Sequence, residues 1–246
     1  MKIIEYGKQH NDIVMFLHGG GLSWWNFRAE AELLSEQFHV VLPVLDGHAD
    51  SDSDFQSMED NAGRIISFID SEYGGSVFLI GGLSLGAQIL TEMLSMRKDI
   101  CRYAIIESAS VIPSDLTKAL IEPSFGPSYG LIKKKWFAKM QFKYLRIRED
   151  LFEEYYTDTS KITKDNMIAF LKANTAYKLK PEIQNCKASV RIIAGEKEQD
   201  KMIRSAEMIH ELLPGSRLEI KKGLYHGEYS LNQPEVYVKD LLDMIK

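Results

Sequence analysis

The 246-residue chain is 45% hydrophobic and 26% charged, a balance typical of globular proteins that excludes disordered and fibrous classes. Its net charge of −5 lacks the basic character of a duplex-binding domain, so we expect no nucleic-acid partner. The only cysteines are Cys101 and Cys186, which favours reduced thiols over a disulfide framework. The sequence shows no signal peptide and no apolar run of about 20 residues, so we expect a cytoplasmic protein without stable membrane insertion.

The chain alternates short β-rich runs with longer helical patterns. We predict strands at residues 13–17, 40–43, 77–80, 103–107, 190–194 and 217–221. We predict helices at residues 27–37, 59–72, 87–96, 205–213 and 235–245. Several of the strands are almost entirely apolar, as expected when helices cover both faces of a parallel sheet. The alternation predicts an α/β fold with a doubly wound, mostly parallel sheet.

Residues 111–180 interrupt this alternation, because they contain helical and turn-like sequence and no strand pattern. Their 13 basic and eight acidic residues give a net charge of +5, which leaves −10 for the rest of the chain. A helical insertion between two strands suggests a cap or lid over the sheet edge where open α/β sheets bind ligands. We therefore predict a core of residues 1–110 and 181–246, with residues 111–180 as a helical cap.

Within this insertion, residues 131–148 are basic and place apolar side chains near helical spacing, at Ile132, Trp136, Met140 and Tyr144. We interpret the segment as a cap helix whose apolar face covers the ligand pocket while its lysines face water. The alternative is contact with an anionic membrane surface or an anionic substrate.

The stretch GGLSLGAQ at residues 81–88 joins an apolar strand pattern to a helical pattern. A nucleophilic serine needs this setting of strand, sharp turn and helix. Gly82 and Gly86 allow the backbone to fold tightly around Ser84, and the helix start offers free N–H groups to a developing oxyanion. The pattern predicts that Ser84 is a nucleophile rather than part of a simple glycine turn.

A serine nucleophile needs a base, and a base needs a carboxylate that orients it. Among the six histidines, His226 follows the last predicted strand and would lie at the same sheet edge as Ser84. Three carboxylates follow neighbouring strands at that edge: Glu198, Asp200 and Glu107. With any of them the chain order is serine, acid, histidine. We assign structural roles to His18 and His48, which lie in glycine-containing loops.

The glycine loop HGGG at residues 18–21 follows an early strand, where a second oxyanion donor is expected. It lacks the Gly-Lys-Ser/Thr ending of a phosphate-binding loop, which disfavours a nucleotide site. The acidic loop DGHADSDSDF has neither the glycine nor the final glutamate of a calcium loop, so we expect no metal. Trp24 and Trp25 follow the glycine loop, and they either line a substrate pocket or pack in the core.

Four motifs in order, FLHGGGLSWWNF, VVLPVLDGHADSD, IGGLSLGAQI and RIIAGE with the following segment through LYHGEYS, resemble those of the α/β-hydrolase superfamily in its lid-bearing esterase and lipase-like branch. The resemblance implies an α/β-hydrolase fold with a helical cap inserted after the sixth strand. It further implies that Ser84 is the nucleophile, His226 the base, and the backbone N–H groups of Gly20 and Leu85 the oxyanion hole.

The chain departs from the family pattern in two places. The usual aspartate, three residues after the glycine that ends the acid strand, is Glu198 here, so we rank Glu198 first and Asp200 and Glu107 behind it. The loop usually written PGHGxS is DGHADS. The resemblance implies a serine hydrolase that cleaves a small carboxylic ester without a cofactor. Alternatives on the same scaffold are a thioesterase, a C–C hydrolase or lyase, and a ligand-binding protein with a slow or inactive triad.

Overall fold

The computed structural model describes residues 1–246. A seven-stranded sheet forms its centre, in the spatial order β1-β3-β2-β4-β5-β6-β7. The strands are β1 (Ile3–Tyr6), β2 (Ile13–Leu17), β3 (His39–Pro43), β4 (Val77–Leu83), β5 (Cys101–Glu107), β6 (Ser189–Gly195) and β7 (Arg217–Lys221). All neighbouring pairs are parallel except β1 with β3, which are antiparallel. The expected doubly wound, mostly parallel sheet is confirmed, with β1 as an additional edge strand.

The α-helices follow the strands in the expected alternation. They are α1 (Arg28–Leu34), α2 (Met58–Tyr73), α3 (Leu85–Met96), α4 (Asp115–Ile132), α5 (Lys135–Tyr144), α6 (Phe152–Lys161), α7 (Lys164–Ala176), α8 (Asp200–Leu212), α9 (Glu228–Asn232) and α10 (Pro234–Met244). Three short 3₁₀ helices are η1 (Trp24–Phe27), η2 (Glu149–Leu151) and η3 (Pro181–Asn185). No helix combines the length and the apolarity needed to cross a lipid bilayer.

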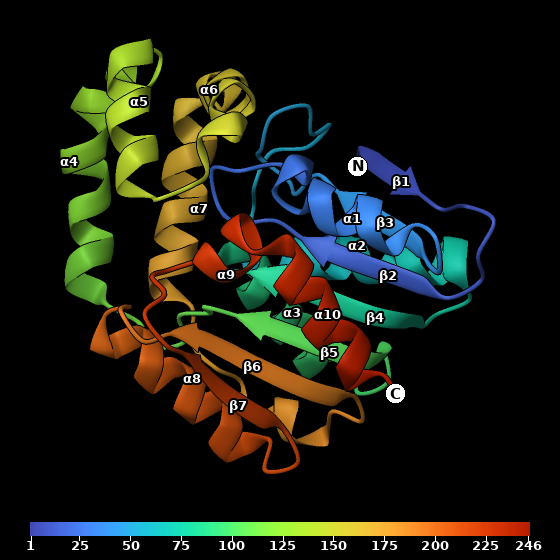
Figure 1. Cartoon of the computed structure of the whole chain (residues 1–246). Coiled ribbons are helices and arrows are strands. Elements are labelled where there is room, and N and C mark those ends of the chain that lie inside the picture. Colours follow the sequence, from blue (N-terminus) through green and yellow to red (C-terminus); the bar gives the residue numbers. More distant parts are fainter.

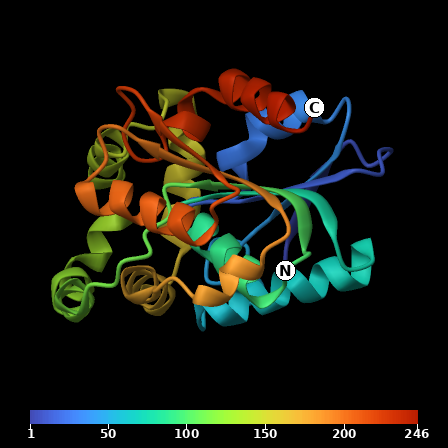
Figure 2. The same ribbon diagram turned by 90° about the horizontal axis from the view of Figure 1, so that it is seen from below.

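Helices cover both faces of the sheet. α1 and α10 lie on one face, and α2, α3 and α8 lie on the other (Figures 1 and 2). Successive strand residues point to opposite faces, so Phe16 and Leu79 join the apolar core on the α1 and α10 side, whereas Met15 and Ile80 join the core on the other side. All four side chains are almost fully buried, and each such burial contributes roughly 1.5–3 kcal/mol.

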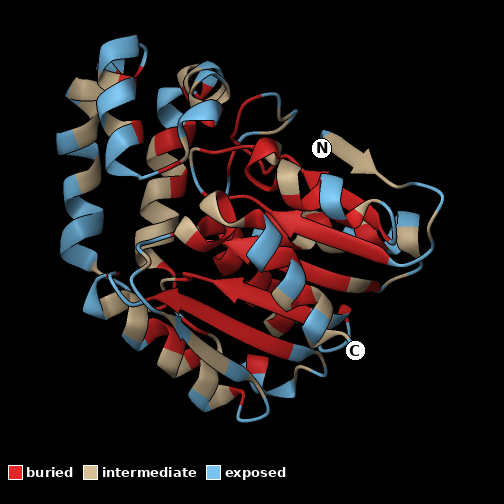
Figure 3. Ribbon diagram, viewed as in Figure 1, coloured by how far each residue is buried: buried red, intermediate tan, exposed pale blue.

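Residues 111–180 contain α4 to α7 and no strand. Figure 1 shows these helices grouped beyond the ends toward which β4, β5 and β6 point. The insertion follows the fifth strand in chain order, and not the sixth as expected, because only one strand, β1, precedes the first parallel strand. The outer surfaces of α4 and α5 are exposed over much of their length (Figure 3).

The prediction that residues 131–148 form one cap helix with its apolar face turned inward is wrong. The helical pattern breaks at Lys133 and Lys134, so Ile132 ends α4 and shares no face with the residues of α5. Ile132 is buried, whereas Trp136, Met140 and Tyr144 are 64%, 56% and 84% exposed. α5 packs inward instead through Ala138 and Phe142; the Phe142 ring lies 5.3 Å from that of Phe152 and 5.2 Å from that of Tyr155.

Candidate active site

Ser84 lies on the turn between β4 and α3, with φ 52° and ψ −110°. A positive φ is uncommon for a residue other than glycine and costs on the order of 1–3 kcal/mol, so the surrounding structure must hold it. The two flanking glycines make the turn possible. A Cβ atom at Gly86 would lie 2.1 Å from the carbonyl oxygen of Leu17, and one at Gly82 would lie 2.6 Å from that of Gly86. The turn therefore presents Ser84 at the sheet edge in a strained conformation.

The structure brings Ser84, His226 and Glu198 together. The Ser84 Oγ lies 3.0 Å from His226 Nε2, and His226 Nδ1 lies 2.7 Å from Glu198 Oε2. A carboxylate only accepts hydrogen bonds, so His226 Nδ1 carries the proton and Nε2 is left to accept from the serine hydroxyl. The side chain of His226 is 44% exposed, whereas that of Glu198 is fully buried. The imidazole thus faces solvent and the carboxylate lies beneath it.

The Glu198 carboxylate is held by three donors. Its Oε1 accepts from the backbone N–H of Gly195 and from the hydroxyl of Ser108, each at 2.7 Å, while Oε2 accepts from His226. Burial raises the pKa of Glu198, but the hydrogen bond and charge of His226, with the Gly195 and Ser108 bonds, outweigh it and hold the pKa below its ordinary value. Glu198 is therefore ionised at neutral pH.

Ser108 was not among the residues predicted for the site. This residue directly follows β5 and adopts a φ of 56°, and its N–H donates to the Ile193 carbonyl on β6 at 2.8 Å. Its position directly after a strand, at the sheet edge where Ser84 and His226 were expected, could have marked it as a candidate. The reach of its hydroxyl to Glu198 depends on the pairing of β5 with β6 and could not be read from local sequence.

The other two candidate acids do not contact His226. Glu107 is buried below the nucleophile turn, where its Oε1 accepts from the Ser230 N–H at 3.2 Å and its carbonyl accepts from the Ser84 N–H at 2.9 Å. Burial raises the pKa of Glu107 to about 7, so its carboxyl is largely protonated below neutral pH. Asp200 is an exposed residue at the start of α8.

The backbone N–H groups of Gly20 and Leu85 have no hydrogen-bond partner and lie on segments next to the Ser84 turn. Leu85 is the first residue of α3, where N–H groups have no partner within the helix. Gly19 donates to Asn26 and Gly21 donates to His48, each at 3.0 Å, whereas the Gly20 N–H between them has no such partner. A Cβ atom at Gly20 would lie 3.5 Å from the Leu85 Cβ, so the two segments are in contact.

Two buried neutral histidines fix the glycine loop. His18 Nδ1 donates to the Gly19 carbonyl at 2.9 Å and Nε2 accepts from the Leu45 N–H at 3.1 Å. His48 Nδ1 donates to the Asp46 carbonyl at 3.1 Å, and its Nε2 accepts from Gly21. Burial lowers the pKa of both rings, that of His48 to about 4. Each neutral ring therefore donates once and accepts once, which locks the loop that carries Gly20.

The helical insertion reaches this loop. The Thr159 hydroxyl donates to the Gly21 carbonyl at 2.9 Å, and the Phe170 ring stacks 4.8 Å from that of His48.

Trp25 is almost fully buried, and its indole N–H donates to Asp158 of α6 at 3.0 Å. Trp25 and the half-buried Trp24 thus belong to the apolar core on the α1 side, Trp24 at its margin.

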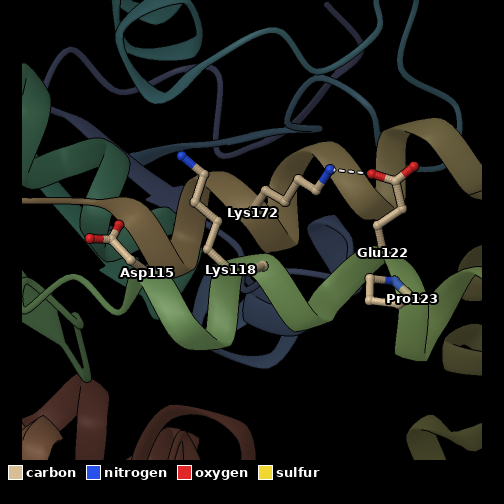
Figure 4. Close-up of a pocket in the computed structure, with 6 residues that line it drawn as sticks. Asp115, Lys118, Glu122, Pro123 and Lys172 are labelled. Atoms are coloured by element: carbon tan, nitrogen blue, oxygen red, sulfur yellow. Dashed lines mark hydrogen bonds and ion pairs between the residues drawn. The ribbon is translucent and has the colours of Figure 1, made fainter.

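Two further observations concern ligands. No group of three or more His, Cys, Asp or Glu side chains is placed to hold a metal ion. A pocket of about 510 Å³ lies between α4 and α7, away from Ser84, and Figure 4 shows its charged rim, where Lys172 pairs with Glu122 at 2.5 Å. Its lining residues are Asp115, Lys118, Ala119, Glu122, Pro123 and Lys172.

The sequence matches the alpha/beta hydrolase family over residues 14–239, and the chain belongs to this family. None of the curated proteins is matched. An enol-lactonase from Burkholderia xenovorans LB400 superposes with a TM-score of 0.81 at 14% identity, covering 99% of this chain and 95% of that one. A malate-bound esterase from Thermogutta terrifontis superposes with a TM-score of 0.80 at 15% identity, covering 99% of this chain and 92% of the esterase chain.

MenH from S. aureus gives a TM-score of 0.79 at 16% identity, covering 99% of this chain and 97% of its own. At these identities the structural likeness establishes the fold. The chain therefore has the α/β-hydrolase fold, and an esterase and an enol-lactonase are among its structural neighbours.

Proposed function

We propose that the protein is a serine hydrolase that cleaves a small carboxylic ester through an acyl-enzyme. The observation that carries the proposal is the continuous hydrogen-bonded chain from Ser84 Oγ through His226 to Glu198. A serine hydroxyl becomes nucleophilic only beside such an oriented base. The esterase and the lactonase among the structural neighbours both act on an acyl–oxygen bond, which agrees with this choice.

In the acylation half-reaction, the Ser84 proton moves to His226 Nε2 as Oγ attacks the ester carbonyl. The N–H groups of Gly20 and Leu85 receive the negative oxygen of the tetrahedral intermediate. The carbon–oxygen bond to the alcohol then breaks, and His226 returns the proton to the departing oxygen. Glu198 stabilises the imidazolium that forms between these steps.

In the deacylation half-reaction, water gives a proton to His226 and attacks the acyl carbon. Ser84 leaves with the proton that His226 returns, and a carboxylic acid is released. The residues present complete the cycle without a metal or a cofactor.

We assign residues 111–180 as the cap over this site. Contacts from Thr159 and Phe170 to the glycine loop support the assignment, since they hold α6 and α7 against the oxyanion segment. A cap fixed in this way limits the size of the acyl or alcohol group that reaches Ser84. We also assign the protein to a reducing compartment such as the cytoplasm, because Cys101 and Cys186 are both free.

The test combines a fluorophosphonate probe with a chain-length series of p-nitrophenyl esters. We expect rapid labelling of Ser84, and turnover that falls as the acyl chain outgrows the capped site. The Ser84→Ala variant should lose labelling and at least ~10³-fold of kcat. Full turnover in Ser84→Ala contradicts the mechanism, and tight ester binding without turnover by the unaltered chain favours a ligand-binding role.

A further inference from the structure

The solvent face of α5 carries a row of large apolar side chains along its whole length. Trp136, Met140 and Tyr144 recur every four residues, which places them along one side of the helix. They are 64%, 56% and 84% exposed, whereas Ala138 and Phe142 on the opposite side are buried. A row of large exposed apolar side chains on one helix is uncommon on a monomeric surface and indicates an interaction site.

The same face is cationic and carries no acid. Between Pro123 and Arg148 the chain has seven basic residues and no aspartate or glutamate. Lys139 and Lys143 are exposed beside the apolar row, and neither forms an ion pair, whereas Lys135 at the helix start pairs with Glu153 at 2.7 Å. The outer surface of α5 therefore combines aromatic and aliphatic side chains with uncompensated positive charge.

This combination fits an anionic bilayer surface better than a second copy of the chain. A helix with lysines beside aromatic residues lies in the plane of the membrane interface, with apolar side chains at the acyl boundary and cations at the headgroups. A symmetric contact between two copies would place Lys139 and Lys143 against the same lysines of the partner, which disfavours it. The chain has no helix that crosses a bilayer, so the contact is peripheral.

We propose that the outer face of α5 docks onto the surface of an anionic lipid bilayer. Trp136, Met140 and Tyr144 enter the interface, and Lys139 and Lys143 meet the lipid phosphates. The segment after α5 joins this face to the active edge, because the Arg146 guanidinium lies 3.8 Å from the ring centroid of Tyr225, the residue before His226. Docking through α5 thus brings the His226 loop toward the lipid surface.

Vesicle co-sedimentation tests the proposal. The chain carries a net charge of −5, so general electrostatic attraction cannot bring it to anionic lipid, and binding must come from a local basic face. We expect binding to vesicles of equal phosphatidylglycerol and phosphatidylcholine, no binding to pure phosphatidylcholine, and weakening as salt rises. Trp136 fluorescence should shift to the blue on binding, and the shift should be absent in Trp136→Phe.

Matched variants locate the contact. Lys139→Ala with Lys143→Ala should weaken partitioning by ~30-fold, since each lysine near an anionic surface is worth roughly fivefold. The control is Lys98→Ala with Lys178→Ala, two exposed lysines without ion pairs that are remote in sequence from α5, and it should bind like the unaltered chain. Truncating two members of the apolar row with Trp136→Ala and Met140→Ala should also weaken binding.

Three outcomes overturn the proposal: no binding to the anionic vesicles at low salt, equal losses in both lysine pairs, or dimerisation through α5 in sedimentation velocity without lipid binding. The Ser84→Ala variant should bind vesicles as the unaltered chain does. Docking is therefore measured separately from hydrolysis, and failure of either proposal leaves the other standing.

Discussion

Replacing Glu198 by glutamine tests most directly the proposed role of His226 as a general base that Glu198 orients. Oε1 accepts two hydrogen bonds at 2.7 Å, from Gly195 and Ser108, so the glutamine carbonyl must take that position. Its NH₂ group then occupies the place of Oε2, 2.7 Å from His226 Nδ1. A donor facing Nδ1 forces the ring proton onto Nε2, where it faces Ser84 and blocks proton transfer.

A histidine in the wrong tautomer costs a triad about 10⁴-fold in kcat, which corresponds to about 5.5 kcal/mol of transition-state stabilisation. We expect this loss for Glu198→Gln in steady-state hydrolysis of p-nitrophenyl acetate. KM and thermal stability should change little, since the shape of the side chain is preserved.

The matched controls are Glu107→Gln and Asp200→Asn. Neither carboxyl contacts His226, and the carboxyl of Glu107 has a pKa of about 7, so the neutral amide resembles its protonated form. Both variants should keep kcat within about threefold of the unaltered chain, as expected for residues outside the catalytic unit. A Glu198→Gln variant within tenfold of normal activity, or a larger loss in either control, would refute the reasoning.

Three other changes have definite expected results. Ser108→Ala should lower kcat about tenfold with KM unchanged, because it removes one of three donors to Glu198 and touches no substrate. Gly86→Ala should lower the free energy of unfolding by ~3 kcal/mol or more, since the new Cβ would lie 2.1 Å from a backbone oxygen of β2. Its control is Gly215→Ala, where the Cβ meets open space, and this variant should leave the melting temperature unchanged. Burial lowers the pKa of His48 to about 4, so its contribution to stability is full above pH 6.5 and falls by ~3 kcal/mol toward pH 4; urea titrations should show a smaller decrease in His48→Gln.

Each of these expectations has a clear contrary result. A change in KM alone for Ser108→Ala would place Ser108 in substrate binding. Equal melting temperatures for the two alanine variants would contradict the close approach of Gly86 to β2. An identical pH dependence in His48→Gln would contradict the lowering of the His48 pKa by burial.

Local patterns predicted much of the fold and singled out two of the three residues that the structure joins by hydrogen bonds, Ser84 and His226. Every parallel strand was predicted, and most of them were marked by apolar runs, because strands covered on both faces need apolar residues; β7, with the sequence RLEIK, is not apolar throughout. β1 was missed because it is only four residues long and half-exposed, so it lacks that pattern. Ser84 and His226 were recognised because each follows a strand in a distinctive glycine-containing turn.

Contacts that depend on tertiary packing could not be predicted from the sequence. Three carboxylates at one edge could be ranked from the sequence, but only the strand pairing shows that Glu198 is the one in contact with His226. The predicted orientation of α5 was wrong for a related reason. Helical spacing identifies which residues share a face, but it does not show which face points inward, and here the inward side is formed by Ala138 and Phe142.

Four hydrogen-bonded residues follow four strands that are consecutive in the sheet: Ser84 after β4, Ser108 after β5, Glu198 after β6 and His226 after β7. A slip of one residue between neighbouring strands displaces a side chain by about 3.3 Å and reverses its face, far beyond the tolerance of a hydrogen bond. A molecule misaligned in this way would keep its strand content and compactness and still lack the hydrogen bonds among these four residues, on which the proposed hydrolysis depends. Recovery of turnover during refolding would therefore measure strand alignment, whereas circular dichroism would measure only the amount of strand.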